Sequence, residues 1–226
     1  MVAPAVRTVR AEPVAAGLAL VALVAWVAVS LGAADLEGAD VPGFAVAWTV
    51  MMAAMMLPSL LLVGRAVAGV APSGWAVTPF VLGYLLTWAA FGLGVGGVLA
   101  AARAAGVDVA GPVATGAVLL AAAIYQLTPA KDACLRRCRH PLGLVVTHWR
   151  PGAPGALRMG VVHGAWCAGC CWALMAVLLT LGAMSVGWML LVAALVSMEK
   201  LLPWKRAATG TVTAVLVALV VIEVAA

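Results

Sequence analysis

The stretch VAAGLALVALVAWVAVSL at residues 14–31 carries no charged side chain and no proline. A helix rises 1.5 Å per residue, so about twenty apolar residues cross a hydrocarbon core of roughly 30 Å. Comparable apolar blocks recur along the whole chain, separated by short polar breaks. Backbone polar groups must be satisfied internally within lipid, and continuous blocks of Ala, Leu and Val therefore indicate membrane-crossing helices. The sequence predicts an all-α, polytopic transmembrane helical bundle.

The overall composition excludes a soluble globular protein. Of the 226 residues, 66% are hydrophobic and 9% are charged, whereas a soluble domain carries about 25% charged residues. The net charge of +5 does not indicate a nucleic-acid partner, because the basic residues lie between apolar blocks and form no stripe interleaved with aromatic residues. We expect the lipid bilayer to be the main partner.

We predict about seven helices in one integral membrane domain that spans residues 1–226. The expected helices cover residues 14–34, 44–64, 75–101, 110–129, 159–181, 185–202 and 207–225, and residues 131–158 form a large cytoplasmic loop. The break near residues 182–187 is short, and the fifth and sixth helices could also be drawn as one block. The first block exceeds the apolar length of about 7–15 residues that a secretory signal has, so we expect it to be retained rather than cleaved.

The placement of positive charges predicts the orientation. With the N-terminus in the cytoplasm, twelve of the thirteen Lys and Arg residues fall in cytoplasmic segments, and Arg103 alone falls outside. This bias is the one that the positive-inside rule describes. An odd number of helices then places the C-terminus outside.

All five cysteines and all three histidines lie between residues 134 and 171. Cys134 and Cys138 are four residues apart, and Cys167 has the same helical relation to Cys170 or Cys171, so each set shares one face of a helix. Thiolates are soft ligands suited to Cu(I) or zinc, and structural disulfides are not expected on the reducing cytoplasmic side. His163 lies one turn before Cys167 and could be a further ligand. The alternative is that these cysteines are small buried apolar side chains.

A second group of soft ligands lies in the predicted helix at residues 44–64, in the segment MMAAMMLPS at residues 51–59. Thioether sulfur is a neutral soft ligand that favours Cu(I), although methionine also fills gaps in apolar cores. Pro58 removes a backbone donor and predicts a kink. Met56 and Cys167 each lie nine residues from an arginine at the cytoplasmic end of their helix, which places both about 13 Å from that surface. The candidate metal ligands are Cys134, Cys138, Cys167, Cys170, Cys171, His163, Met51, Met52, Met55 and Met56.

The pair Glu199 and Lys200 ends the predicted helix at residues 185–202. A carboxylate near the membrane is costly unless it is paired. We favour an internal ion pair over an interfacial position.

Four segments together resemble a bacterial family of integral membrane proteins, catalogued as domain of unknown function 2182 and described as predicted metal-binding. They are MMAAMMLPS (51–59), YQLTPAKDACLRRCRHP (125–141), GAWCAGCCWALM (164–175) and LGAMSVGWMLLVAALVSMEK (181–200). The resemblance covers roughly residues 44–210. It implies metal binding and a multi-pass protein of the bacterial inner (cytoplasmic) membrane, but it implies no reaction.

The sequence leaves two main functions open. The first is binding of a soft metal ion, Cu(I), by the cysteine and methionine clusters for copper transport or for delivery to a membrane metalloenzyme. The second is an accessory structural subunit of a larger membrane complex, such as a copper-dependent oxidase or monooxygenase, in which the cysteines hold zinc or merely pack. A thiol–disulfide enzyme using Cys167 and Cys170 is a third possibility, but these residues lie within a membrane helix on the reducing side. No hydrolytic or nucleotide motif is present, so we expect no catalysis.

Overall fold

The computed structural model describes residues 11–32, 36, 39–70, 75–109, 111–182 and 185–225, and within these residues the fold is all-helical with no strand. The helices are α1 (Ala11–Ser30), α2 (Val41–Met56), the 3-10 helix η2 (Leu57–Leu60), α3 (Leu61–Val70), α4 (Val77–Ala104), α5 (Pro112–Gln126), α6 (Pro129–Cys138), α7 (Pro141–His148), α8 (Ala153–Gly182), α9 (Val186–Leu201) and α10 (Lys205–Ala225). The prediction of an all-α fold is confirmed. Residues 33, 34 and 110, at the ends of two predicted helices, lie outside the described residues.

The number of helices that could cross a membrane differs from the prediction. Within the described residues, five spans are long and apolar enough, namely Pro13–Ser30, Val41–Val70, Val77–Ala104, Ala153–Gly182 and Arg206–Glu223, and a bent pair would make a sixth. The predicted helix at 185–202 is α9, which has 16 residues and is shorter than the usual 17–25 of a spanning helix. By length and composition, the structure therefore supports five or six spans, whereas the sequence predicted about seven.

The helix predicted at residues 44–64 is interrupted around Pro58, where the sequence predicted a kink. The α-helix α2 ends at Met56, a 3-10 turn follows over Leu57–Leu60, and α3 continues to Val70. Proline has no amide hydrogen and its ring crowds the preceding turn, so the regular α-helix is interrupted here. The interruption lies directly after Met56.

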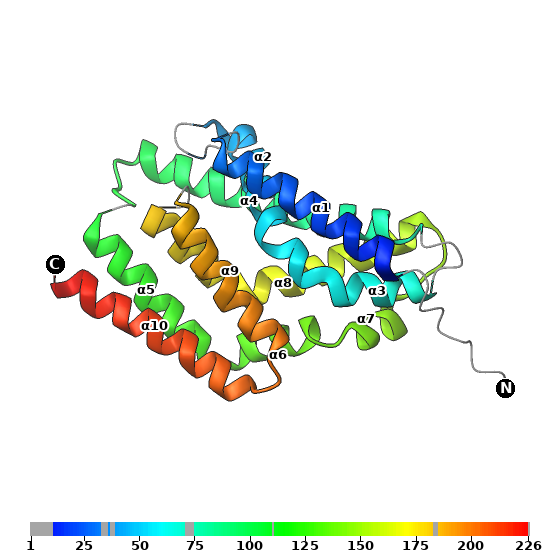
Figure 1. Ribbon diagram of the computed structural model, residues 1–226. Helices are drawn as coiled ribbons and strands as arrows, with labels where there is room; N and C mark the ends of the chain where they lie inside the picture. The colour runs from blue at the N-terminus through cyan, green and yellow to red at the C-terminus, as the bar shows by residue number, and fades with distance from the viewer. Residues whose placement is uncertain are drawn as a thin grey trace.

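The segment predicted as a cytoplasmic loop, residues 131–158, is largely helical. Helix α5 ends at Gln126, and α6 begins at Pro129 in a direction bent by 69°. The Thr128 side chain caps α6 by accepting a hydrogen bond from the backbone amide of Lys131, and proline is favourable in the first turn of a helix. Figure 1 shows α6 and α7 following one another along one edge of the bundle, and α5 beside α10. The bend turns α6 onto α8.

Helices α4 and α8 cross at very short range. A Cβ atom at Gly83 would lie 2.1 Å from the carbonyl oxygen of Leu157, and one at Gly160 would lie 2.0 Å from that of Phe80. Small residues allow membrane helices to approach in this way. Helix α8 ends at Gly182, whose φ of 108° is rarely adopted by other residues. This ending separates α8 from α9, so the fifth and sixth predicted helices are two elements.

We expect Gly83→Ala to destabilise the protein by about 1–3 kcal/mol, because the new methyl group would collide with the α8 backbone. Gly94→Ala on the same helix is the matched control, since nothing lies within 4 Å of its Cβ position. It should be neutral, or stabilising by up to about 1 kcal/mol. Thermal unfolding of both variants in detergent checks the difference, and equal midpoints would show that the crossing is looser than described.

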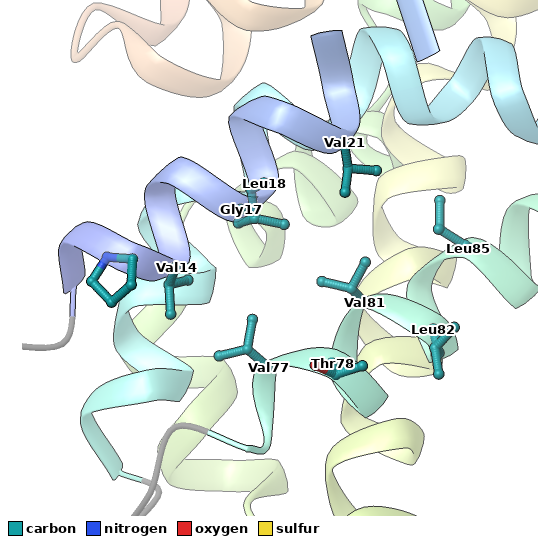
Figure 2. Close-up of a pocket in the computed structure, with 10 residues that line it drawn as sticks. Val14, Gly17, Leu18, Val21, Val77, Thr78, Val81, Leu82 and Leu85 are labelled. Carbon is teal, nitrogen blue, oxygen red and sulfur yellow. The ribbon is translucent and has the colours of Figure 1, made fainter. Parts of the chain in front are cut away.

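An apolar cavity of about 570 Å³ opens between α1 and α4. Figure 2 shows Val14, Leu18 and Val21 of α1 facing Val81 and Leu85 of α4 across it. Among the residues that the structure describes, its lining contains no sulfur, imidazole or carboxylate group. This cavity therefore offers nothing that would hold a soft metal ion.

Candidate metal centre

Three cysteine sulfurs meet in the interior of the bundle. The Sγ atoms of Cys138, Cys167 and Cys170 all lie within 4.8 Å of one another, and all three residues are buried. The sulfurs of Cys138 and Cys170 are 3.8 Å apart. Cys167 and Cys170 lie one turn apart on the same face of α8, and Cys138 is the last residue of α6. We call these three residues the thiol centre.

The geometry of the thiol centre suits one soft metal ion. Thiolate sulfur lies about 2.3 Å from a zinc-like ion, so three sulfurs in a trigonal arrangement would be about 4 Å apart. The described separations are close to this value and need adjustments of less than about 1 Å. Within the described residues, the group contains no fourth Cys, His, Asp or Glu ligand.

The other two cysteines lie outside the thiol centre. The Sγ of Cys171 is 2.9 Å from the carbonyl oxygen of Cys167, to which it can donate, and the residue is buried in the core. Cys134 is half-buried, and its sulfur packs against Gly169, where an added Cβ atom would lie 2.8 Å from it. The structure thus brings together three of the five cysteines that the sequence proposed as ligands.

His163 lies beside the thiol centre and not within it. The residue is buried, and its Nδ1 atom has no hydrogen-bond partner in the described part of the chain. Its ring centroid is 5.9 Å from that of Tyr84 and 6.0 Å from that of Phe80. With Cys138 and Lys200 it lines a small cavity of about 30 Å³, enough for one water molecule.

Of the four candidate methionines, Met56 has a described contact with the surroundings of the thiol centre. Its Sδ atom is 3.6 Å from Nζ of Lys200, which is also 2.9 Å from Sγ of Cys167. The sulfurs of Met56 and Cys167 therefore contact the same ammonium group, and their common depth below the membrane surface stays a prediction. The remaining three are buried members of the hydrophobic core: Met51, Met52 and Met55.

Sequence reasoning missed two residues that contact the thiol centre. The hydroxyl oxygen of Tyr84 on α4 is 3.1 Å from Sγ of Cys167. Lys200 on α9 contacts the same sulfur and also Oγ of Ser59, at 3.3 Å. For Lys200 the sequence did carry a signal: a charged side chain at the end of an apolar helix needs a specific partner.

The ion pair expected at Glu199 is present, and its partner is Lys131. Nζ of Lys131 lies 2.6 and 2.7 Å from the two carboxylate oxygens of Glu199, and both residues are buried. The pair joins α6, which carries Cys138, to α9, which carries Lys200. A guanidinium nitrogen of Arg139 also donates to the carbonyl oxygen of Leu202 at the end of α9. Polar contacts from the first turn of α6 and from the residue after its end therefore hold α6 against the end of α9.

Three buried thiols on α6 and α8, in a bundle with five helices long and apolar enough to cross a membrane among the described residues, define a helical protein whose side chains fit a soft metal ion. The sequence model of one family, described as PpoB2: copper chaperone, matches residues 45–223. The chain belongs to this copper chaperone family. The sequence led us to expect a metal-binding family, and the match shows a copper-related one. No curated protein and no solved structure matches the chain.

Proposed function

We propose that this protein is a membrane-embedded Cu(I) chaperone, which binds one copper ion at the thiol centre and delivers it to a membrane metalloenzyme. The observation that carries the proposal is the meeting of three buried sulfurs within 4.8 Å in a chain of a copper chaperone family. Copper is the cargo in this proposal, and the protein performs no catalysis. The resemblance to domain of unknown function 2182 is consistent with it, and we infer that both family descriptions refer to one type of protein.

The donor set favours Cu(I) over the zinc alternative. Thiolate and thioether sulfur select Cu(I) among the available metals, and the thiol centre has Met56 as a nearby neutral sulfur. Structural zinc sites in proteins are almost always closed, four-coordinate tetrahedra. A group of three sulfurs without a fourth Cys, His or acidic ligand, within the residues described, suits a lower coordination number.

We propose that the chaperone is a multi-pass protein of the bacterial inner membrane with its N-terminus in the cytoplasm. The five or six helices of sufficient length and apolarity support a membrane location. The proposed orientation rests on the seven-helix topology predicted from the sequence, in which twelve of the thirteen positive residues are cytoplasmic. In Figure 1 the start of α1 and the end of α10 lie at opposite ends of the bundle. This arrangement suits a chain whose ends emerge on different sides.

Metal content of the purified protein tests the proposed function. The full chain, reduced and held in detergent, is offered Cu(I) and Zn(II) together, and bound metal is measured by mass spectrometry after gel filtration. We expect about one copper ion per chain and X-ray absorption that shows sulfur as the nearest neighbour. Retention of zinc in place of copper would instead favour the structural-subunit function, and retention of neither metal would leave the thiols as packing residues.

A further inference from the structure

The ammonium group of Lys200 contacts three side chains, one of which belongs to the thiol centre. Its Nζ atom is 2.9 Å from Sγ of Cys167, 3.6 Å from Sδ of Met56 and 3.3 Å from Oγ of Ser59. These contacts come from α8, α2 and η2, so three separate elements fix the position of one positive charge. The closest of the three is a sulfur of the thiol centre.

The carboxylate of the neighbouring residue Glu199 does not neutralise the positive charge of Lys200. Glu199 accepts two hydrogen bonds from Lys131, and among the described residues Lys200 forms no ion pair with a carboxylate. A lysine inside an apolar segment needs a partner that compensates its charge. Here the available partner is the sulfur of Cys167.

The charge of the metal-loaded centre depends on the ion that it holds. Three thiolates with a monovalent ion carry a net charge of −2, and with a divalent ion they carry −1. The attraction of each complex to an ammonium ion at a fixed distance scales with the product of the two charges. One nearby lysine therefore stabilises the monovalent complex about twice as much, in free energy, as the divalent complex.

Building on the proposed function, we propose that Lys200 is the fixed counter-ion of the copper centre and makes it selective for a monovalent soft ion. Met56 and Ser59 hold the ammonium beside Cys167, and the ammonium offsets the excess negative charge of the loaded thiolates. Lys200 is thus a specificity-determining residue that acts through charge and is not itself a metal ligand.

Ag(I) and Cd(II) test this role because both are soft ions with the same electron configuration and differ in charge. Their affinities are measured on the full-length protein in detergent by competition with a chelator, for the wild type and for Lys200→Met. Loss of a partner next to a metal ligand weakens binding about 10–100-fold. Since the metal-free centre is the same in both measurements, its own interaction with Lys200 cancels in the comparison, and the ratio of Ag(I) to Cd(II) affinity should fall by about 10-fold in Lys200→Met.

The controls separate charge from structure. Lys200→Arg keeps the charge and should restore the wild-type ratio of Ag(I) to Cd(II) affinity, whereas Arg206→Met removes an exposed charge elsewhere and should leave both affinities unchanged. Lys200→Gln is the neutral variant to measure if the methionine variant does not fold. Equal losses for the two ions, or a larger loss for Cd(II), would overturn the counter-ion role. Failure of the wild type to bind copper would overturn the proposed function itself.

Discussion

Replacing Cys167 by alanine is expected to lower the affinity of the protein for Cu(I) by more than about 100-fold. Its sulfur belongs to the thiol centre and also contacts Tyr84 and Lys200, so the substitution removes a ligand and separates the counter-ion from the metal. Loss of a group that merely supports a metal ligand already costs about 10–100-fold in affinity. Competition with a coloured Cu(I) chelator, under reducing conditions, measures the change.

Cys171→Ala is the matched control for this prediction. Cys171 is buried on the same helix as Cys167, but its sulfur faces the carbonyl oxygen of Cys167 and lies outside the group of three. The control variant should bind Cu(I) with about the affinity of the wild type. A comparable loss in both variants would indicate that the site extends over more of α8 than the thiol centre.

Removing one partner of the buried ion pair is expected to have the largest effect on stability. Lys131→Met leaves the carboxylate of Glu199 without its partner in the protein interior, at a cost of about 3–5 kcal/mol. Since the pair joins α6 to α9, the same variant should also bind Cu(I) more weakly. Unfolding of the detergent-solubilised protein by a denaturing detergent, followed by circular dichroism, measures the loss.

The exposed pair on the same helix provides the comparison. Asp132 and Arg136 form an ion pair in which both side chains are about half exposed, and exposed pairs contribute roughly 0–1 kcal/mol. Asp132→Asn should therefore have little effect on stability. The double variant Lys131→Met, Glu199→Leu replaces the pair by apolar groups and should recover most of the loss; a double variant as unstable as the single one would contradict this account.

The apolar blocks of the sequence predict the helices because each block must be helical to satisfy its own backbone inside lipid. Pro58 marks an interruption of the α-helix because proline lacks an amide hydrogen, and Gly182 marks a helix end because glycine adopts a positive φ readily. The number of spans could not be obtained in the same way. Helix α9 is shorter than its apolar block suggested, and the polar segment after Gln126 folds into two further helices.

The candidate site could be predicted only in part, because helical spacing gives the relation of side chains along one helix and not between helices. Spacing along one helix shows which side chains share a face, and this was enough to place Cys167 on one face with Cys170 or Cys171. It does not show which face meets another helix, so Cys134, Cys171 and three of the methionines could not be separated from the residues at the centre. The contact between Lys200 and Cys167 joins residues 33 positions apart on different helices, and no periodicity encodes such a contact.

Because the chain bends between α5 and α6, the three sulfurs of the proposed copper site stand on helices of very different length. Two sulfurs stand on one uninterrupted helix of 30 residues, while the third stands at the tip of a helix of 10 residues. A modest tilt of α6 would move the sulfur of Cys138 away, while the sulfurs of Cys167 and Cys170 would stay together on α8. In the proposed delivery of copper, this would let a thiol of the recipient bind the ion before the ion leaves Cys167 and Cys170, so that tight binding and rapid transfer need not conflict.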